Sequence, residues 1–538
     1  MSDDGHPEGP SRRAVLAAGA VLAANALLGC EDTVPVEPTP DSLVDAEAMT
    51  DGAIIPDAAS TVTEDGATND PVDSAGQPDP VDAGADAELD LGPARDAETP
   101  DVQMPDGEFP DAETPEDAEG PADAVVGPDP TAWVRALPES DAFPLGVATG
   151  DAAPTSIIAW TQYTGDTVLA LVVWRDQSIA GVFATDPNEA GFVHVEVDDL
   201  DAGTHYEYAF VEYDDEVPLA RSAQGIFRTA IALDTLAPVV FGAIACTNQR
   251  FNLAPLERAA RHPFDLFLHL GDCTYADGAE TPDEYRELWA QNLARAPYRS
   301  LRGQTSFLAT WDDHEVDNNW NPEEMDPAHV AVARDAFFEH QPIGRLPMDP
   351  DRIWRSFRWG MTAEFFVLDT RGERRPSSRG RPDAQYLSPA QFDWLLAGLR
   401  DSPALFKIVM NSVPIGEFPY PSTRDRWVGY PAQRDALLSA IELDDIEGVV
   451  FISGDFHHAS AGRAAAAGPG ARVLEFLVGP GGQIPNPLHI ALPALPQFDW
   501  ATGVNNYARF HLDPETRELT VSYRTSTDRL AYEATYAL

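Results

Sequence analysis

Residues 264–275 have the sequence Phe264-Asp265-Leu266-Phe267-Leu268-His269-Leu270-Gly271-Asp272-Cys273-Thr274-Tyr275, in which an apolar run leads directly into a polar turn. A short apolar run bounded by turn residues predicts a strand that is buried on both faces. Strands of this kind belong to sheets covered by other elements, and polar groups gather where such strands end. The stretch therefore predicts a layered core with chemically active side chains just after Leu270.

Further apolar runs of this kind occur along the C-terminal half of the chain, where they alternate with segments of helical periodicity. We predict further buried strands at residues 239–245, 306–310, 365–368, 406–410, 448–452 and 473–478. Helices are predicted at residues 253–261, 282–294, 328–339, 388–399 and 431–441. Together they predict an α+β domain of layered α-β-β-α architecture over residues 233–538.

Residues 131–232 follow a different pattern, with polar and apolar side chains alternating along short segments. Alternation at 167–174, 191–197 and 204–213 predicts half-buried strands, and several such strands within about a hundred residues predict a small β-sandwich domain. Residues 199–206 resemble the leucine-turn-tyrosine segment of fibronectin type III domains. His194 and His205 lie in these strands without a second metal ligand nearby, so we expect a structural role for this domain.

Four polar clusters follow predicted strands directly: Ala245-Cys246-Thr247-Asn248, Gly271-Asp272-Cys273-Thr274-Tyr275, Trp311-Asp312-Asp313-His314-Glu315 and Ser453-Gly454-Asp455-Phe456-His457-His458. Carboxylates that converge at one sheet edge repel each other unless cations lie between them. We therefore predict a multinuclear metal site. Its predicted ligands are Cys246, Asp272, Tyr275, Asp313, Asp455 and His457, with Asn411 as a further oxygen donor. We expect His458 to point elsewhere.

The donor types narrow the choice of metal but leave alternatives open. Cys246, Tyr275 and His457 supply thiolate, phenolate and imidazole, which suit iron(III), although zinc also accepts thiolate and imidazole. Asp313 and Asp455 supply hard oxygens, which suit calcium, magnesium or manganese. A disulfide between Cys246 and Cys273 is an alternative that would remove the thiolate from the site.

The order of these motifs resembles one known family. Gly271-Asp272-x-x-Tyr275, then Trp311-Asp312-Asp313-His314-Glu315, then Gly454-Asp455-x-His457, resembles the PhoD-type branch of the calcineurin-like metallophosphoesterases. Supporting segments are Gly146-Val147-Ala148-Thr149-Gly150-Asp151, Leu368-Asp369-Thr370-Arg371 and Asp425-Arg426-Trp427-x-Gly429-Tyr430. Cys246 stands where general calcineurin-like enzymes have an Asp-x-His motif, as in PhoD-type proteins.

The resemblance implies a phosphoesterase of alkaline phosphatase type that acts on small phosphate esters and serves to scavenge phosphate. It also implies iron(III) at the Cys246 position, calcium at a second position, and Asp272 bridging the two. His314 is then expected to stabilise the transition state or to protonate the leaving oxygen. A phosphodiesterase or phospholipase on the same centre is one alternative, and a non-catalytic metal-binding surface protein is another.

Arg371 ends a predicted strand and carries five N–H donors in a fixed fork, a geometry that suits a phosphoryl group. We therefore predict Arg371 as a phosphoryl clamp in catalysis. The alternative is an ordinary salt bridge at the surface.

The first thirty residues have the features of an export signal. Arg12 and Arg13 precede an uncharged run at 14–29, which is short for a membrane span and ends in Leu27-Leu28-Gly29-Cys30. This predicts a twin-arginine lipoprotein signal, with Cys30 acylated and the protein anchored in a bacterial cell envelope, in the periplasm or at the cell surface. An ordinary Sec signal is the alternative.

Residues 31–130 contain 29 acidic side chains and one basic side chain, Arg95, with Phe109 as the sole aromatic. So little apolar surface cannot offset the entropy of ordering, so we predict a disordered, extended tether. Calcium binding by this segment is an alternative. The whole chain has a formal net charge of −54, which disfavours nucleic acid as a partner.

Overall fold

The computed structural model describes residues 129–418 and 426–538. The predicted signal at 1–30, with Cys30, lies outside the described residues, as do nearly all of the predicted tether at 31–130 and Asp425 of the supporting motif. Among the helices of the described part, none combines the length and the apolar character that a bilayer span requires.

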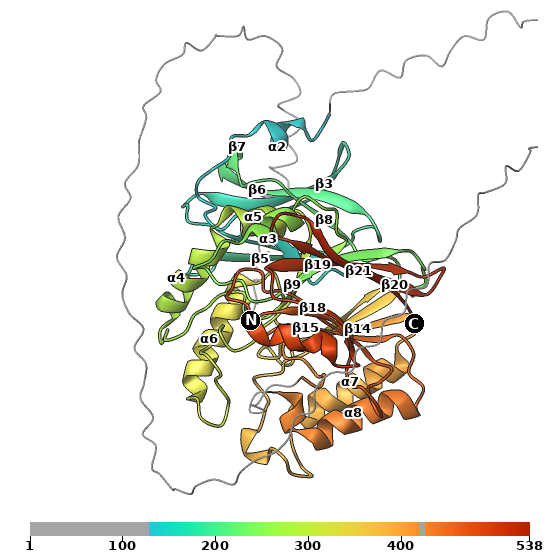
Figure 1. Ribbon diagram of the computed structural model, residues 1–538. Helices are drawn as coiled ribbons and strands as arrows, with labels where there is room; N and C mark the ends of the chain where they lie inside the picture. Colours follow the sequence, from blue (N-terminus) through green and yellow to red (C-terminus); the bar gives the residue numbers. More distant parts are fainter. Residues whose placement is uncertain (1–128, 419–425) are drawn as a thin grey trace, which may run out of the picture. The chain divides into compact units, whose positions relative to one another are not determined.

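Two large sheets form the centre of the molecule (Figure 1). The nine-stranded sheet has the order β21 (Leu530–Ala537), β20 (Glu518–Thr525), β19 (Asn506–Asp513), β9 (Val239–Ile244), β10 (Leu266–Leu270), β11 (Ser306–Thr310), β1 (Val147–Gly150), β2 (Ile157–Gln162) and β5 (Phe192–Val197). The seven-stranded sheet has the order β12 (Arg355–Trp359), β13 (Ala363–Val367), β14 (Phe406–Asn411), β15 (Val449–Ser453), β17 (Leu474–Leu477), β16 (Ala459–Arg463) and β18 (Phe498–Thr502).

The two sheets pack face to face through one continuous apolar core. Phe241 of β9 meets Phe365 of β13 edge to face, with ring centroids 5.2 Å apart, and Phe241 also stacks on Phe510 of β19 at 4.7 Å. Because β9, β10 and β11 are parallel, as are β13, β14, β15 and β17, the carboxyl ends of each set meet at one edge. That edge is where the predicted ligands were placed.

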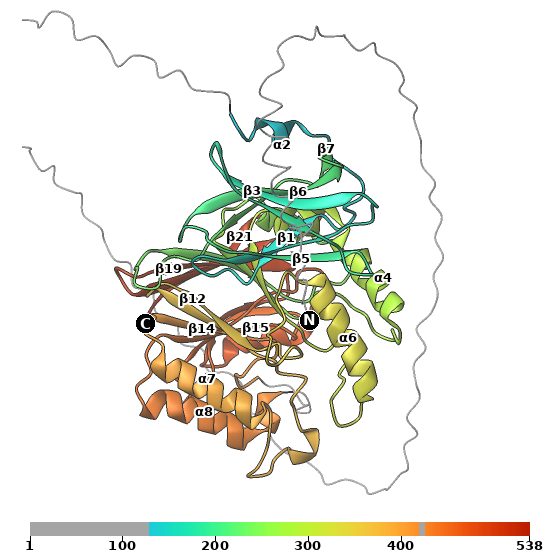
Figure 2. The same cartoon turned by 180° about the vertical axis from the view of Figure 1, so that it is seen from behind.

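Helices cover the outer faces of both sheets. On the nine-stranded sheet lie α3 (Ala254–Ala259), α4 (Pro282–Leu293), α5 (Ala296–Arg302) and α6 (Pro327–His340). On the seven-stranded sheet lie α7 (Pro389–Asp401) and α8 (Pro431–Leu443), side by side in both views (Figure 2). The remaining short helices are α2 (Ala132–Ala136), η2 (Pro376–Ser378), η3 (Trp427–Gly429) and η4 (Pro487–Ala494). The layers thus run helix, sheet, sheet, helix.

Three helices begin where a capping side chain precedes a proline. Thr281 forms a capping box with Glu284 at the start of α4, while Asp326 and Ser388 cap α6 and α7 through their side-chain oxygens. A proline at the first helical position sacrifices no hydrogen bond, since that N–H has no partner within the helix. These local signals explain why the predicted helix starts lie within one residue of the observed ones.

The N-terminal strands form a sandwich that is built into the main sheet. A third sheet contains β4 (Ser178–Thr185), β3 (Val168–Arg175), β6 (His205–Asp214), β7 (Val217–Arg221) and β8 (Gly225–Arg228). It shares its apolar core with β1, β2 and β5, which belong to the nine-stranded sheet. Strand β1 runs parallel to β11, with Thr149 opposite Ser306. The predicted boundary at residues 232 and 233 falls between β8 and β9, but hydrogen bonds of the sheet cross between the two parts.

One detail of the sandwich bears on the predicted leucine-turn-tyrosine segment. The hydroxyl of Tyr206 accepts a hydrogen bond from the backbone N–H of Asp201 at 2.9 Å. This is the kind of bond by which a tyrosine at a strand corner fixes the preceding turn.

Candidate metal centre

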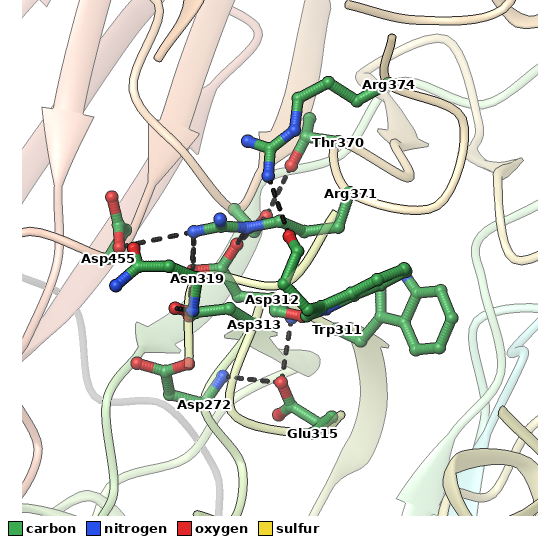
Figure 3. Close-up of polar contacts among 12 residues, drawn as sticks. Asp272, Trp311, Asp312, Asp313, Glu315, Asn319, Thr370, Arg371, Arg374 and Asp455 are labelled. Carbon is green, nitrogen blue, oxygen red and sulfur yellow. Dashed lines mark hydrogen bonds and ion pairs between the residues drawn. The ribbon is translucent and has the colours of Figure 1, made fainter. Parts of the chain in front are cut away.

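The loops that follow the parallel strands bring metal-competent side chains into three overlapping groups. Within each group the ligand atoms lie within 4.8 Å of one another. The groups are Cys246, Asp272 and His457; Asp272, Asp313 and His314; and Asp312, Asp313 and Asp455. Figure 3 shows Asp272, Asp312, Asp313 and Asp455 gathered in one place from the loops that follow β10, β11 and β15.

Two residues belong to more than one group. Asp272 is common to the first and second, and Asp313 is common to the second and third. A shared carboxylate can offer one oxygen to each of two cations. The arrangement therefore suits two neighbouring cation positions with Asp272 between them.

Four of the predicted ligands have left-handed backbone conformations. The φ angles are 57° at Cys246, 56° at Asp272, 66° at Asp455 and 51° at His457. Non-glycine residues rarely adopt this conformation, and where they do the surrounding structure must enforce it. Close contact between the loops supplies that constraint: a Cβ on Gly454 would lie 2.7 Å from the Cβ of Ala245. These four backbone conformations therefore occur at positions from which side chains point into the site.

Tyr275 lies beside Asp272 and His457, two members of the first group. The Tyr275 hydroxyl donates to Oδ2 of Asp272 at 3.0 Å and lies 3.3 Å from Nε2 of His457. Burial lowers the pKa of His457 to about 4, so its imidazole is neutral at neutral pH and its nitrogen can bind a metal. Gln249 fixes Tyr275 at the backbone, accepting from its N–H at 3.1 Å and donating to its carbonyl at 2.8 Å.

The protonation and hydrogen bonding of the predicted ligands show whether cations fit this site. Burial raises the pKa values of Cys246, Asp272 and Tyr275 well above their ordinary ranges, and neighbouring acidic groups raise them further. Oδ1 of Asp272 is fully buried and has no hydrogen-bond partner within the described residues. A buried, unpaired carboxylate oxygen is costly unless a cation or a proton accompanies it. The residues therefore fit a metal centre.

His314 belongs to the second group, and its ring centroid lies 4.0 Å from that of Tyr275. Its Nδ1 is 2.7 Å from Oδ1 of Asp277. Burial alone would lower the pKa of His314, but Asp272, Asp277 and Asp313 outweigh it and raise the pKa to about 10. In the metal-free protein the ring is therefore an imidazolium at neutral pH, able to donate a proton.

Arg371 is surrounded by carboxylates of the site. Its side chain is fully buried, and its Nε and Nη2 donate to the two oxygens of Asp312 at 2.6 and 3.1 Å. Nη2 also lies 3.6 Å from oxygens of Asp313 and Asp455 (Figure 3). The guanidinium thus neutralises a cluster of carboxylates, while its Nη1 is buried and has no hydrogen-bond partner among the described residues. The alternative of a salt bridge at the surface is wrong because Arg371 is buried, and its role as a phosphoryl clamp stays a prediction.

Asn411 ends β14, and both ends of its amide are hydrogen-bonded. Its amide oxygen accepts a hydrogen bond from the indole N–H of Trp427 at 3.1 Å, and its amide nitrogen donates to the Ser453 hydroxyl at 3.3 Å. The amide oxygen keeps a second lone pair, so the role of Asn411 as an oxygen donor to a metal stays a prediction. His458, expected to point away, packs its ring 5.7 Å from that of Phe418.

Cys246 and Cys273, the two cysteines among the described residues, are both free and buried. Cys246 belongs to the first group, whereas Sγ of Cys273 lies 3.1 Å from Nδ1 of His269 on the helix-covered side of the sheet. The disulfide alternative is therefore wrong, and the thiol of Cys246 is available as a ligand.

Three neighbours of the site received no role at the sequence level: Glu315, which ends the quoted cluster 311–315, Asp277 and Asn319. Glu315 accepts hydrogen bonds from backbone N–H groups of two loops, Asp277 contacts His314, and the backbone N–H of Asn319 donates to Oδ2 of Asp313 at 2.7 Å. Asp277 and Asn319 lie within six residues of a predicted site residue, so proximity to the motifs was the available signal.

Comparisons with known protein families and structures identify the family of this chain. The sequence model of the PhoD-like phosphatase N-terminal domain matches residues 130–231, and that of the PhoD-like phosphatase matches residues 241–484. The chain belongs to the PhoD-like phosphatase family. The predicted resemblance is thereby confirmed, and the matches together cover well over half of the chain.

Individual relatives show how far the likeness extends. Alkaline phosphatase D of Bacillus subtilis (strain 168) is 28% identical over 390 residues, which is 60% of this chain and 66% of that protein, just under two thirds of its length. A solved structure of PhoD is 25% identical, with a TM-score of 0.65, covering 74% of this chain and 89% of the other. Purple acid phosphatase PPD1 from yellow lupin seeds is 11% identical, with a TM-score of 0.55 and 73% of each chain covered, which shows that the fold is shared.

Proposed function

We propose that this member of the PhoD-like family hydrolyses phosphate esters of small molecules at a two-cation centre, in the manner of an alkaline phosphatase that scavenges phosphate. The observation that carries the proposal is the pair of overlapping ligand groups that share Asp272, with Cys246 and His457 on one side and Asp313 on the other. The names of the relatives support the same reaction class.

For the cations we propose iron(III) held by Cys246, Asp272, Tyr275 and His457, and calcium held by Asp272, Asp313 and Asp455. Thiolate and phenolate donors suit iron(III), and an all-carboxylate set suits calcium. Zinc in the first position, and magnesium or manganese in the second, are the alternatives that metal analysis would distinguish. Bound cations supply charge neutralisation for the phosphoryl oxygens and make water a better nucleophile at neutral pH.

The chain's own residues then have distinct parts in the proposal. Asp277 engages Nδ1 of His314, which leaves Nε2 as the atom that delivers a proton to the leaving oxygen. Arg371 neutralises Asp312 and lies close to Asp313 and Asp455, so these carboxylates stay together before any cation arrives.

We further propose that the chain is exported and anchored by lipid at Cys30 in the bacterial cell envelope, as residues 12–13 and 27–30 indicate. The substrate would then be a phosphate ester outside the cytoplasm. The strongly acidic composition supports a small ester over a nucleic acid.

The test is hydrolysis of p-nitrophenyl phosphate and bis-p-nitrophenyl phosphate by the purified chain with iron(III) and calcium. Asp313→Asn should reduce turnover strongly, whereas the same change at the exposed Asp335, which pairs with Arg345, should leave turnover at the wild-type level. Preference for the diester would favour a phosphodiesterase. Stoichiometric metal without turnover of either ester would favour a non-catalytic metal-binding protein.

A further inference from the structure

One buried carboxylate joins the two loops that carry the central ligands. Glu315 is fully buried, and its oxygens accept three hydrogen bonds from backbone N–H groups. Oε2 accepts from Asp272 at 3.2 Å and from Asp312 at 2.8 Å (Figure 3). Oε1 accepts from Cys273 at 2.5 Å. Glu315 thus bonds to the loop after β10 and to its own loop after β11.

The hydrogen bonds of Glu315 connect backbone groups at and beside the proposed metal ligands. One donor is the backbone of Asp272, which is shared by two ligand groups, and another is the backbone of Asp312, which directly precedes Asp313. The distance between Asp272 and Asp313 is therefore fixed through the carboxylate of Glu315. Strands β10 and β11 set the register of the two loops, but both loops leave the ladder before the ligands.

We propose that Glu315 is a positioning residue that sets the spacing between the two cation positions by holding Asp272 and Asp313 at a fixed separation. The inference rests on the proposed two-cation centre. Partners that orient metal ligands in this way commonly contribute about 10–100-fold to metal affinity or activity.

The chemistry of the site requires this particular side chain. A glutamine has the same shape but only one oxygen, so its amide N–H₂ would face at least one backbone N–H that needs an acceptor. An aspartate keeps both oxygens but is one methylene shorter, so it cannot reach both loops from the same backbone position. Glu315→Gln therefore tests whether two acceptor oxygens are needed. Glu315→Asp tests whether the side chain needs the length of glutamate to bond to both loops.

Glu475 offers a matched control. It too is buried, and its two oxygens accept from the backbone N–H groups of Ile415 and Gly416 at 2.9 and 2.8 Å and from the Ser453 hydroxyl at 2.7 Å. The 415–416 loop carries none of the proposed ligands. Glu475→Gln should thus lower the melting temperature through the same loss of acceptors without changing the spacing of the cation positions.

The experiment measures iron and calcium per chain during dialysis against graded EDTA, together with the melting temperature, for wild type and the three variants. We expect Glu315→Gln and Glu315→Asp to release metal at chelator concentrations about 10–100-fold lower than wild type. Glu475→Gln should release metal as wild type does. The visible absorption of the iron form should shift in the Glu315 variants alone, since the Asp272 loop would move relative to Cys246.

Two outcomes would overturn the proposal. Retention of metal by both Glu315 variants at wild-type chelator concentrations would do so, as would an equal loss of metal in Glu475→Gln. The phosphoesterase proposal fails separately: if wild type binds both metals but cleaves no ester, the metal affinities of the variants still decide the role of Glu315. If Glu315→Gln does not fold, Glu315→Asp, which keeps the charge and both oxygens, carries the test.

Discussion

Replacement of Arg371 by methionine probes the electrostatic core of the site. Methionine preserves much of the side-chain volume but removes the only cation that the structure places within 4 Å of Asp312, Asp313 and Asp455 among the described residues. In the metal-free protein the variant leaves three neighbouring carboxylates, two of them fully buried, without that guanidinium. Removing one partner of a buried ion pair in this way costs about 3–5 kcal/mol of the free energy of unfolding.

The matched control is Arg400→Met. Arg400 also makes short bonds to a carboxylate, 2.6 and 2.7 Å from Oδ2 of Asp444, but nearly half of its side chain is exposed. Exposed pairs contribute about 0–1 kcal/mol, so the two arginines differ by burial far more than by bond length.

The assay is urea unfolding of the metal-free protein at neutral pH, with Asp312→Asn and the Arg371→Met/Asp312→Asn double variant completing a mutant cycle. Because Asp312→Asn removes the charge that Arg371 chiefly neutralises, the double variant should be less destabilised than the sum of the single variants. A loss below about 1 kcal/mol for Arg371→Met, equal to that of Arg400→Met, would refute the assignment of Arg371 as the neutralising cation.

Other predictions concern the ligands, the pH dependence and the anchor. Tyr275→Phe should fade or shift the visible charge-transfer band of the iron-loaded protein and reduce turnover, and Cys246→Ser should remove the thiolate contribution; an unchanged spectrum in both would place iron elsewhere. Burial raises the pKa of Asp272 well above its ordinary value and that of Glu315 to about 7, so folding of the metal-free protein takes up protons at these groups. Buried histidines such as His457, whose pKa burial lowers to about 4, add the opposite slope below about pH 7. The free energy of unfolding of the metal-free protein should therefore fall as the pH rises between about 7 and 9, where Asp272 and His314 hold protons that the unfolded chain has released, and added metal should offset the fall because cations displace the proton of Asp272. Asp313, whose pKa is held low chiefly by Arg371 despite burial, adds no slope in that range; a flat profile in chelator would contradict this. Cys30→Ala should move the protein from the membrane to the soluble fraction with unchanged specific activity, and a variant that stays with the membrane would exclude acylation as the anchor.

The sequence predicted the parts of this molecule that depend on local chemistry. Apolar runs located β9, β10, β11 and β15, and the polar turns after them located Cys246, Asp272, Asp313 and Asp455. Each of these signals spans fewer than a dozen residues, so periodicity and turn chemistry were sufficient to find them.

What the sequence did not predict depends on long-range contacts. The pairing of β1 with β11 joins residues more than 150 positions apart, so the predicted domain boundary at 232 and 233 could not show that the sheet continues across it. The burial of Arg371 and its contact with Asp312 were not predicted, because Asp312 lies 59 positions away and burial has no local signature. Glu315 was missed because its partners are backbone N–H groups, which every loop possesses. The strands β19, β20 and β21 were likewise not assigned, although they complete the edge of the nine-stranded sheet.

Hydrolysis by this protein is proposed to require cations held between Asp272 and its neighbours. The most direct test of this requirement measures metal content and p-nitrophenyl phosphate turnover on the same samples of purified protein, before chelation, after chelation and after readdition of iron(III) and calcium. We expect turnover to disappear with the metals and to return when both are restored. Undiminished turnover in protein stripped of every metal would contradict it.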